Sequence, residues 1–253
     1  MLAVKRHNEI LNMLKISGNV RTNELAAVLD CTEETVRRDL DKLSKQELLV
    51  RTHGGAISLD ERNTDLDHHM REQRNAKEKK DIAKKAASFI RKGETIMLDE
   101  SSTALAMTSF LPRNLPLKVV TSSLLIAQKI ATHENHQLIQ LGGTLDKVSM
   151  SFNGILTELM VSRLRIDRFF FSAKGIDAEQ GASEPTEERA RMKQHIIQYS
   201  KWNCALLDST KIGIRADFYF ITPREIDAFI TDKKTQSQQL KAFEDAGIET
   251  LTA

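Results

Sequence analysis

The twelve residues from Thr32 to Leu43 constrain the fold more than any other stretch, because their spacing separates a buried side of a helix from an exposed one. Val36, Leu40 and Leu43 follow one another at helical intervals, which predicts a single apolar stripe. Thr32 stands where an N-cap belongs, with a hydroxyl that accepts a free backbone N–H group. Polar side chains fill the remaining surface near the helix N-terminus: Glu33, Glu34, Thr35, Arg37 and Arg38. This distribution is typical of a helix that enters the major groove of DNA, contacting base edges first and phosphates just beyond.

Two shorter apolar stripes precede this helix and predict two more helices. Thr22 is placed to cap the second of them, and only Asp30 and Cys31 separate that helix from Thr32. Two short helices joined by a tight turn, the second with exposed arginines, form a helix-turn-helix. The stripes consist of Ile10 and Leu14 in the first helix and Leu25, Ala26 and Leu29 in the second.

Residues 48–57 predict a wing, because a strand, a Gly-Gly turn and the start of a second strand follow the helix-turn-helix. Such a hairpin offers Arg51 and His53 to phosphate or to the minor groove. Residues 1–57 hold nine basic and eight acidic side chains, so the DNA-binding interpretation depends on arrangement and not on bulk charge;. A small helical domain with solvated charges is the alternative.

The same segment resembles the N-terminal domain of the DeoR family of bacterial transcriptional regulators. The resemblance covers essentially all of the first 57 residues. It runs through Arg6, Ile10, Leu14, Gly18, Val20, Glu24-Leu25-Ala26, Leu29, Thr35-Val36-Arg37-Arg38-Asp39-Leu40, Leu43 and Leu49 to Ala56. It implies a winged helix-turn-helix that binds double-stranded operator DNA.

Length and composition fit a two-part intracellular protein. The chain has 253 residues and a formal net charge of +2, which excludes a polyelectrolyte;. Cys31 and Cys204 lack metal-ligand or disulfide spacing and are expected to be apolar residues. Lys5 and Arg6 come at once after the start without the apolar core of a signal peptide, and no apolar run approaches a transmembrane length;. We therefore expect a cytoplasmic protein that makes no contact with the membrane.

From Asp81 onward, strands alternate with helices, which predicts an α/β domain with a largely parallel sheet. A helical stripe from Ile82 to Ile90 precedes the first strand. Expected strands are 95–99, 118–121, 137–141, 168–173, 204–208 and 228–231.

Small hydroxyl residues, glycines and lysines follow these strands. In an open α/β sheet, ligands bind at the carboxyl ends of the strands, where helix N-termini offer free N–H groups to phosphate. Three such loops with nearby lysines predict a site for a phosphorylated small molecule, although a hydroxyl before a helix is often only a cap. The candidate residues are Ser101, Ser102, Thr103, Thr121, Ser122, Ser123, Gly142, Gly143, Lys174, Lys193 and Lys211, with Asp99 and Asp208 at their strand ends.

The C-terminal part also resembles the DeoR family, in its sugar-phosphate sensor domain, which is similar in fold to ribose-5-phosphate isomerase. The matching pieces include 93–96, Leu98-Asp99 with Ser102-Thr103, 120–124, 141–145, 167–170 with 175–177, and 207–213. Three positions depart from the family pattern. Ser122 stands where many members have Asn. Glu100 stands where many members have a small residue, and a carboxylate there would repel phosphate unless it points away or binds a sugar hydroxyl. Arg189 stands where many members have Glu.

The expected organisation is a winged helix-turn-helix domain over residues 3–58, a linker over 59–80 and an α/β effector-binding and oligomerisation domain over 81–253. The linker is dense in charge and is expected to be a solvated helix, or else to relay ligand binding to the DNA-binding domain.

The resemblance implies a repressor of a carbohydrate or polyol operon, released from its operator by a phosphorylated sugar or related metabolite. A homo-oligomer, dimer or tetramer, is expected, without cofactor or metal. Two alternatives stay open. One is a sugar-phosphate isomerase-like enzyme fused to a DNA-binding domain, with Asp99, Asp208 and Lys211 as candidate acid and base groups. The other is a DNA-binding protein that ignores ligands.

Overall fold

A computed structural model describes residues 3–17, 19–46, 48–52, 54–58 and 68–253. The chain forms two compact units, Met1–Leu66 and Asp67–Ala253, and each is described by itself. Gly18 and His53 of the predicted DNA-binding motif lie outside the described residues. In the described ranges no helix combines the length and the apolar character needed to cross a membrane.

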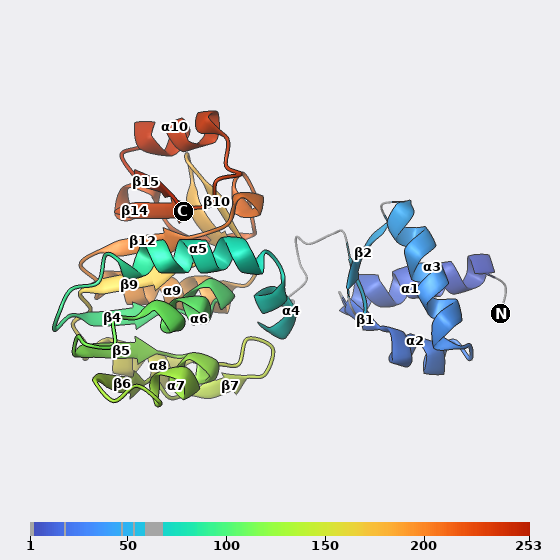
Figure 1. The fold of residues 1–253 in the computed structure, drawn as a ribbon, viewed down its shortest axis with the longest axis horizontal. Helices are drawn as coiled ribbons and strands as arrows, with labels where there is room; N and C mark the ends of the chain where they lie inside the picture. Colours follow the sequence, from blue (N-terminus) through green and yellow to red (C-terminus); the bar gives the residue numbers. More distant parts are fainter. Residues whose placement is uncertain (1–2, 18, 47, 53, 59–67) are drawn as a thin grey trace. The chain divides into compact units, whose positions relative to one another are not determined.

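The first unit is a winged helix-turn-helix, as predicted (Figure 1). Its strands form an antiparallel sheet in the order β1-β3-β2, in which the hairpin β2–β3 is the wing. Asp30 adopts a left-handed conformation (φ 48°) in the turn between α2 and α3, where a short polar side chain tolerates it;. The elements are α1 Ala3–Ser17, β1 Asn19–Arg21, α2 Thr22–Val28, α3 Glu33–Lys45, β2 Leu49–Thr52 and β3 Gly55–Ser58.

The predicted apolar stripes meet in the core of this unit. Ile10, Leu25, Val36 and Leu40 are completely buried, together with Leu14 and Leu43 at the ends of the same stripes. Burial of each such side chain contributes about 1.5–3 kcal/mol to folding. The three helices are therefore held by the residues whose spacing predicted them.

The second unit contains a seven-stranded, wholly parallel sheet in the order β15-β14-β12-β9-β4-β5-β6. The six expected strands all belong to it. Their bounds are β4 Thr95–Leu98, β5 Leu117–Thr121, β6 His136–Gln140, β9 Arg168–Phe171, β12 Asn203–Leu206 and β14 Ala228–Thr231, and β15 Glu249–Thr252 completes the sheet at one edge.

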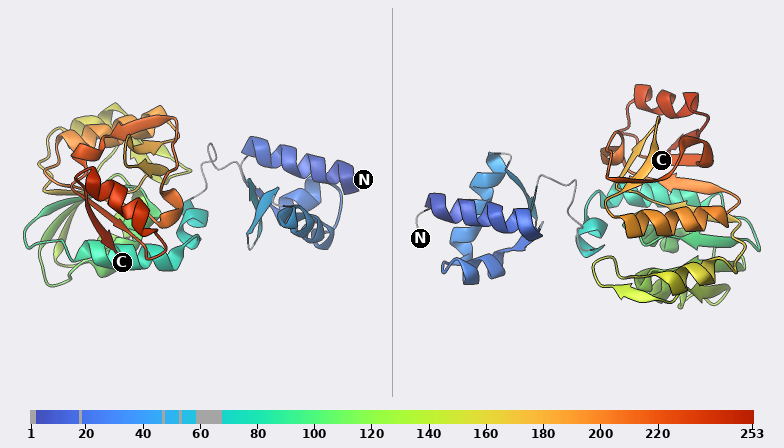
Figure 2. Two further views of the ribbon diagram at one scale, coloured as in Figure 1. Left: turned by 90° about the horizontal axis from the view of Figure 1, so that it is seen from above. Right: turned by 180° about the vertical axis from the view of Figure 1, so that it is seen from behind.

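Helices cover both faces of this sheet. Figure 1 shows α5 Ala76–Ala87, α6 Ser102–Met107 and α7 Leu124–Ile130 on the near face. The view from behind in Figure 2 shows the other face, on which α8 Ile155–Val161 and α9 Glu187–Gln198 lie. The remaining helices are α4 His68–Gln73 and α10 Ser237–Asp245, with short 3-10 turns η1 Thr108–Phe110, η2 Ser209–Lys211 and η3 Pro223–Glu225.

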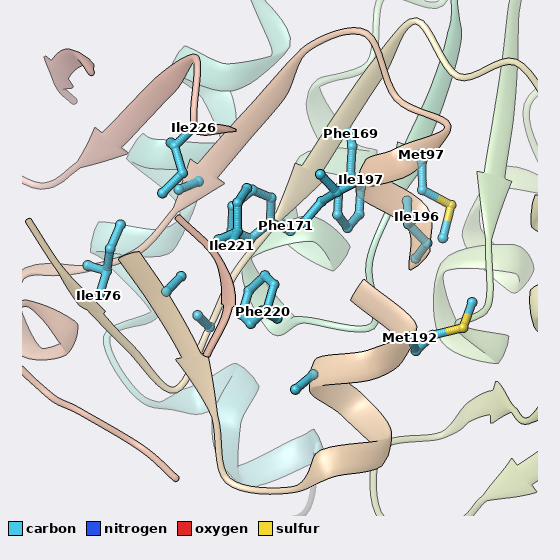
Figure 3. Close-up of a cluster of buried hydrophobic side chains, with 14 of the residues drawn as sticks. Met97, Phe169, Phe171, Ile176, Met192, Ile196, Ile197, Phe220, Ile221 and Ile226 are labelled. Carbon is cyan, nitrogen blue, oxygen red and sulfur yellow. The ribbon is translucent and has the colours of Figure 1, made fainter. Parts of the chain in front are cut away.

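Alternate residues of each central strand enter two separate cores, which is the pattern of a sheet buried on both faces. Phe170 of β9 belongs to the core on the face that α5 covers, whereas Phe169 and Phe171 belong to the core on the opposite face. Figure 3 shows this second cluster, in which Phe171 lies beside Phe220. A small antiparallel sheet of β10 Gly175–Asp177, β11 Gly181–Glu184 and β13 Phe218–Ile221 contributes Ile176, Ala182, Phe220 and Ile221 to this cluster. β7 Thr144–Asp146 and β8 Ser151–Asn153 form a further antiparallel pair.

Residues 68–80 differ from the sequence-based expectation of a linker. They form α4 and the first turn of α5 and belong to the second compact unit. α4 packs against α6, whose N-terminus follows strand β4. Asn75 joins α4 to α5 in a left-handed conformation (φ 50°), and its side chain donates a hydrogen bond to Asp208 Oδ1 over 3.1 Å. The turn between α4 and α5 is therefore hydrogen-bonded to the loop that follows strand β12.

Candidate DNA interface and effector site

Helix α3 has the cap and the two sides that its sequence predicts. Thr32 Oγ1 accepts the backbone N–H of Thr35 over 3.3 Å and caps the helix. Glu33, Glu34, Arg37 and Arg38 are exposed, opposite the buried stripe, while Thr35 is half-buried. The predicted DNA-facing residues of α3 therefore share one polar surface near the helix N-terminus.

The two arginines on this surface pair with acidic residues of their own helix. Arg37 Nη2 lies 2.9 Å from Glu33 Oε2, and Arg38 Nε lies 3.3 Å from Glu34 Oε1. Pairs of this kind at an exposed helix surface contribute only about 0.2–0.5 kcal/mol. The arginines can therefore exchange these carboxylates for DNA phosphates at little cost.

Asp39, in the same motif, has a structural position. It is 3% exposed and binds two residues of α1, accepting hydrogen bonds from Arg6 Nε and, over 2.9 Å, from His7 Nε2. Burial opposes its ionisation, but the hydrogen bonds from Arg6 and His7 outweigh that effect and keep the pKa of Asp39 below its ordinary value;. Asp39 thus joins α1 to the recognition helix.

Outside α3 and its N-cap, the predicted DNA contacts are Arg51, Thr22 and His53. Arg51 binds Asp41 Oδ1 over 2.8 Å and the Gly55 carbonyl oxygen over 2.7 Å, so it braces the wing against α3. Thr22 does not cap α2: Arg21 occupies the N-cap position without a side-chain cap, and Thr22 is the first helical residue and is 5% exposed. Its hydroxyl is therefore poorly placed to reach DNA. His53 lies outside the described residues.

In the second unit, several predicted effector-binding groups are engaged within the protein. Ser101 caps α6 by accepting the Ala104 N–H over 3.1 Å, and Ser123 caps α7 by accepting the Ile126 N–H over 3.3 Å. The Thr121 hydroxyl donates to the Leu98 carbonyl and accepts the Ser123 N–H. Ser101 and Ser123 therefore have the capping role that the sequence left open, and Thr121 links the ends of β4 and β5.

Three other hydroxyl side chains at these strand ends belong to buried residues. Ser102, Thr103 and Ser122 are 6%, 2% and 2% exposed. Their side chains make no hydrogen bond with any residue that the structure describes. Their hydroxyls are therefore the better candidates for contact with an effector.

The Gly142-Gly143 pair closes the loop after β6 against α8. The Gly142 carbonyl accepts the Thr157 hydroxyl over 2.8 Å. Gly143 has φ +151°, and a Cβ there would lie 2.3 Å from Thr157 Oγ1 and 2.5 Å from the Asn153 carbonyl. Close packing therefore requires glycine at position 143, whereas a Cβ at Gly142 would meet only Met160 Sδ at 3.9 Å;.

Lys193 is buried and surrounded by carboxylates. Its Nζ lies 2.6 Å from Glu184 Oε1, 3.0 Å from Asp99 Oδ2 and 3.6 Å from Glu100 Oε1. Burial opposes the ammonium, but Glu100, Glu184 and Asp99 outweigh it and raise the pKa of Lys193 above its ordinary value. Lys193 is therefore committed to these carboxylates and is no free partner for phosphate.

Asp99 is occupied in the same way. Its Oδ1 accepts the Ser101 N–H over 3.0 Å, and its Oδ2 accepts the Ser172 N–H over 2.8 Å. Burial raises the pKa of this carboxyl despite the nearby Lys193. The carboxylate orders the loop after β4, which is a structural use of a residue considered as a catalytic base.

A second group of charges gathers where β12 ends. Asp208 caps η2 by accepting the Thr210 N–H over 3.1 Å, and its Oδ1 also accepts from Asn75. Lys79, 8% exposed, donates from its ammonium to the Arg71 carbonyl. Burial, opposed by Asp208 and reinforced by Lys211 and Arg71, lowers the pKa of Lys79 to about 8.

Lys211 belongs to this group and lacks a close carboxylate. Its ammonium makes no ion pair or hydrogen bond with any residue in the described ranges, although Asp208 and Glu184 act on it at longer range. Burial lowers the pKa of Lys211. Arg71 adds two guanidinium atoms, Nε and Nη2, that are buried without a hydrogen-bond partner among the described residues.

We call Arg71, Lys79, Lys211 and Asp208 the cationic cluster. It contains three cationic side chains and one carboxylate, Asp208, whose Oδ1 already accepts hydrogen bonds. A buried charge without a compensating partner costs free energy. A phosphate dianion would balance it. Of the two other predicted lysines, Lys193 lies in its own network, and Lys174, half-buried after β9, donates its backbone N–H to Ser183.

Sequence reasoning missed Arg71 and Lys79 because both fall in the segment read as a linker. One signal was available. Lys79 precedes Ile82, Ala83 and Ala86 at helical intervals, so it continues the apolar stripe of α5;. A lysine at a buried helical position indicates that its ammonium has a hydrogen-bonding or charged partner, either within the protein or in a ligand.

The two units match two family domains. Residues 6–62 match the DeoR-like helix-turn-helix domain, and residues 74–233 match the DeoR C terminal sensor domain. HTH-type transcriptional regulator YulB of Bacillus subtilis is 34% identical over 98% of this chain and 96% of its own length. The glycerol-3-phosphate regulon repressor of Escherichia coli K12 is 30% identical over 98% of both chains. Among solved structures, ribose 5-phosphate isomerase A of Methanocaldococcus jannaschii aligns with 55% of each chain at a TM-score of 0.40 and 17% identity.

Proposed function

Because this chain belongs to the DeoR family of transcriptional regulators, we propose that it represses a carbohydrate or polyol operon and that a phosphorylated sugar-type effector releases it from its operator. The observation that carries the effector part is the cationic cluster, in which two buried nitrogen atoms of Arg71, close to Lys211, have no hydrogen-bond partner among the described residues. The name of one relative supports repression of an operon linked to a phosphorylated polyol. By that name, it acts on the glycerol-3-phosphate regulon as a repressor.

For the DNA-binding step, the exposed surface of α3 carries the proposal. Arg37 and Arg38 would leave Glu33 and Glu34 for phosphates and base edges in the major groove;. A homo-oligomer, dimer or tetramer, would place two such helices on repeated half-sites about one helical turn apart. The wing would contact the flanking backbone through the hairpin that Arg51 braces.

For the effector step, the phosphate would bind the cationic cluster and the sugar would extend along the strand ends. The hydroxyls of Ser102, Thr103 and Ser122 lie at the ends of β4 and β5 and would complete the site. Arg71 lies on α4, the first described element after residues 59–67, which lead from the DNA-binding unit. An effector held by Arg71 would act on that connection to the extent that it prefers one arrangement over another.

The test is fluorescence anisotropy of the full-length protein on DNA upstream of its own gene, titrated with a panel of sugar phosphates. We expect tight, salt-dependent binding that one phosphate weakens. Arg38→Ala should weaken specific binding at least about tenfold, and each lost phosphate contact should reduce the salt slope by about 0.9. Lys211→Ala should bind DNA normally and lose most of its response to the effector.

Arg91→Ala, an exposed arginine of the second unit, is the control for both variants. Operator affinity of Arg38→Ala equal to that of the wild type would refute the role of α3. DNA binding that ignores every phosphate would refute the effector step.

A further inference from the structure

Glu100, which departs from the family pattern, stands at the carboxyl end of β4 between two groups of charge. Its side chain is 14% exposed, and Lys193 Nζ lies 3.6 Å from its Oε1. Among the described residues, no hydrogen bond from another residue reaches it. Arg71 of the cationic cluster is also close enough to lower the pKa of this carboxyl.

The two neighbouring carboxylates, Asp99 and Glu184, differ from Glu100 because they accept hydrogen bonds from other residues. Asp99 accepts two backbone N–H groups and contacts Lys193, and its side chain is 0% exposed. Glu184 contacts Lys193 at 2.6 Å and its side chain is 6% exposed. Glu100 therefore has the most exposed side chain of the three, and it is the one that accepts no hydrogen bond from another described residue.

Charge is divided unequally across this part of the sheet edge. The cationic cluster has more cations than carboxylates. Around Lys193, the carboxyl groups of Asp99, Glu100 and Glu184 face one ammonium, although burial raises the pKa of Asp99 and of Glu184. Arg189, another departure from the family pattern, acts on both glutamates. A ligand lying across both groups would meet cations at one end and carboxylate oxygens at the other.

We infer that Glu100 determines the specificity of the effector site: it accepts hydrogen bonds from the hydroxyl groups of a monophosphorylated sugar or polyol and excludes ligands with a second anionic group. The inference rests on the proposed function and adds the class of ligand.

The chemistry of the carboxylate supports this assignment. Burial opposes its ionisation, but Lys193 and then Arg189 outweigh burial and lower the pKa of Glu100. An ionised carboxylate only accepts hydrogen bonds, and those from hydroxyl donors are stronger than bonds between neutral groups. A second phosphate or a carboxylate in the same place would meet a like charge, which costs affinity. If Glu100 served only as a counter-ion for Lys193, its removal would change ligand affinities uniformly.

The experiment compares full-length wild type, Glu100→Gln and Glu134→Gln by isothermal titration calorimetry at pH 7. Glu134 is exposed and lies before β6, so its variant is the matched control for loss of one carboxylate. The probes are inorganic phosphate and two matched pairs, glycerol 3-phosphate with 3-phosphoglycerate and glucose 6-phosphate with 6-phosphogluconate. Lys211→Ala reports whether any binding observed uses the cationic cluster.

We expect Glu100→Gln to bind inorganic phosphate and the phosphorylated acids more tightly and to bind the matching polyol or sugar phosphate more weakly. The preference for the uncharged member of a pair should fall about tenfold, which corresponds to about 1.4 kcal/mol. Glu134→Gln should keep the wild-type preference. An unchanged preference in Glu100→Gln, with binding that still requires Lys211, would overturn the inference and leave the proposed function standing. Absence of binding by every probe to the wild type would overturn both.

Discussion

At the scale of single residues, Lys79 gives the clearest support to the proposed phosphate site of the second unit. It lies on the buried stripe of α5 with its ammonium on the Arg71 carbonyl. Burial, with repulsion from Lys211 and Arg71, lowers its pKa from 10.5 to about 8. Keeping this lysine charged therefore costs free energy in the folded protein below pH 8, and a bound dianion would offset that cost.

This environment predicts that phosphate binding weakens as the pH rises through about 8. A bound dianion raises the pKa of Lys79, so binding takes up a proton wherever the free site has lost one. The second ionisation of phosphate, near pH 6 to 7, is nearly complete there, so it contributes little above pH 8. We expect affinity for inorganic phosphate to fall by up to about tenfold per pH unit between 8 and 10 for each proton lost.

Calorimetry in two buffers with different ionisation enthalpies measures this proton uptake directly. Lys79→Arg keeps a charge at every pH in the range and should reduce the pH dependence, with Lys211 as the remaining titrating group. Equal proton uptake by the wild type and Lys79→Arg would show that Lys79 is not in the site.

At the scale of elements, the wing depends on a close approach between β3 and β1. Gly55 pairs with Arg21, and a Cβ at Gly55 would lie 1.8 Å from the Val20 carbonyl oxygen. Gly54, its neighbour in the turn, has nothing within 4 Å of its Cβ position. Of the two glycines in this turn, only Gly55 lies where a side chain would clash with the backbone.

We expect Gly55→Ala to destabilise the first unit by about 1–3 kcal/mol, because a backbone carbonyl cannot yield as a flexible side chain does. Gly54→Ala should change stability by less than about 0.5 kcal/mol. Thermal unfolding followed by circular dichroism compares the two. Equal losses in both variants would mean that the turn, and not the approach of β3 to β1, needs glycine.

How far the sequence predicts each element depends on whether its signal is local. The stripe of α3 and the runs that became β4, β5 and β9 are local patterns, and they were found. β15 was missed because it is a half-exposed edge strand, Glu-Thr-Leu-Thr, with no apolar run. Ser101 and Ser123 were predicted as ligand contacts, and in the structure both cap helices, because one hydroxyl pattern suits both uses;. Their contact with a ligand stays a prediction.

The cationic cluster could not be predicted as a whole. Arg71 and Lys79 approach Lys211 because the chain turns at Asn75, between α4 and α5, and Asn75 binds Asp208, 133 residues away in the sequence. No spacing rule links such positions.

At the scale of the whole molecule, the two compact units have separate hydrophobic cores. The core of the first unit contains only residues between Ile10 and Ala56, and the cores on the two faces of the large sheet begin at Ile82. Each unit should therefore unfold as its own cooperative transition. Asp39 belongs to the first unit alone, through Arg6 and His7, and the cationic cluster belongs to the second.

Scanning calorimetry of the full-length protein should resolve two transitions that respond to different changes. Asp39→Asn should lower only the transition of the first unit, because Arg6 loses the charge that balances it, at a cost of about 3–5 kcal/mol. In the wild type the same transition should fall as the pH drops below about 4, since the pKa of Asp39 is lowered by folding and its contribution is lost on protonation;. Asp39→Asn should lack that part of the acid dependence. Inorganic phosphate should raise only the other transition, and a single transition shifted by both treatments would mean that the two units fold as one.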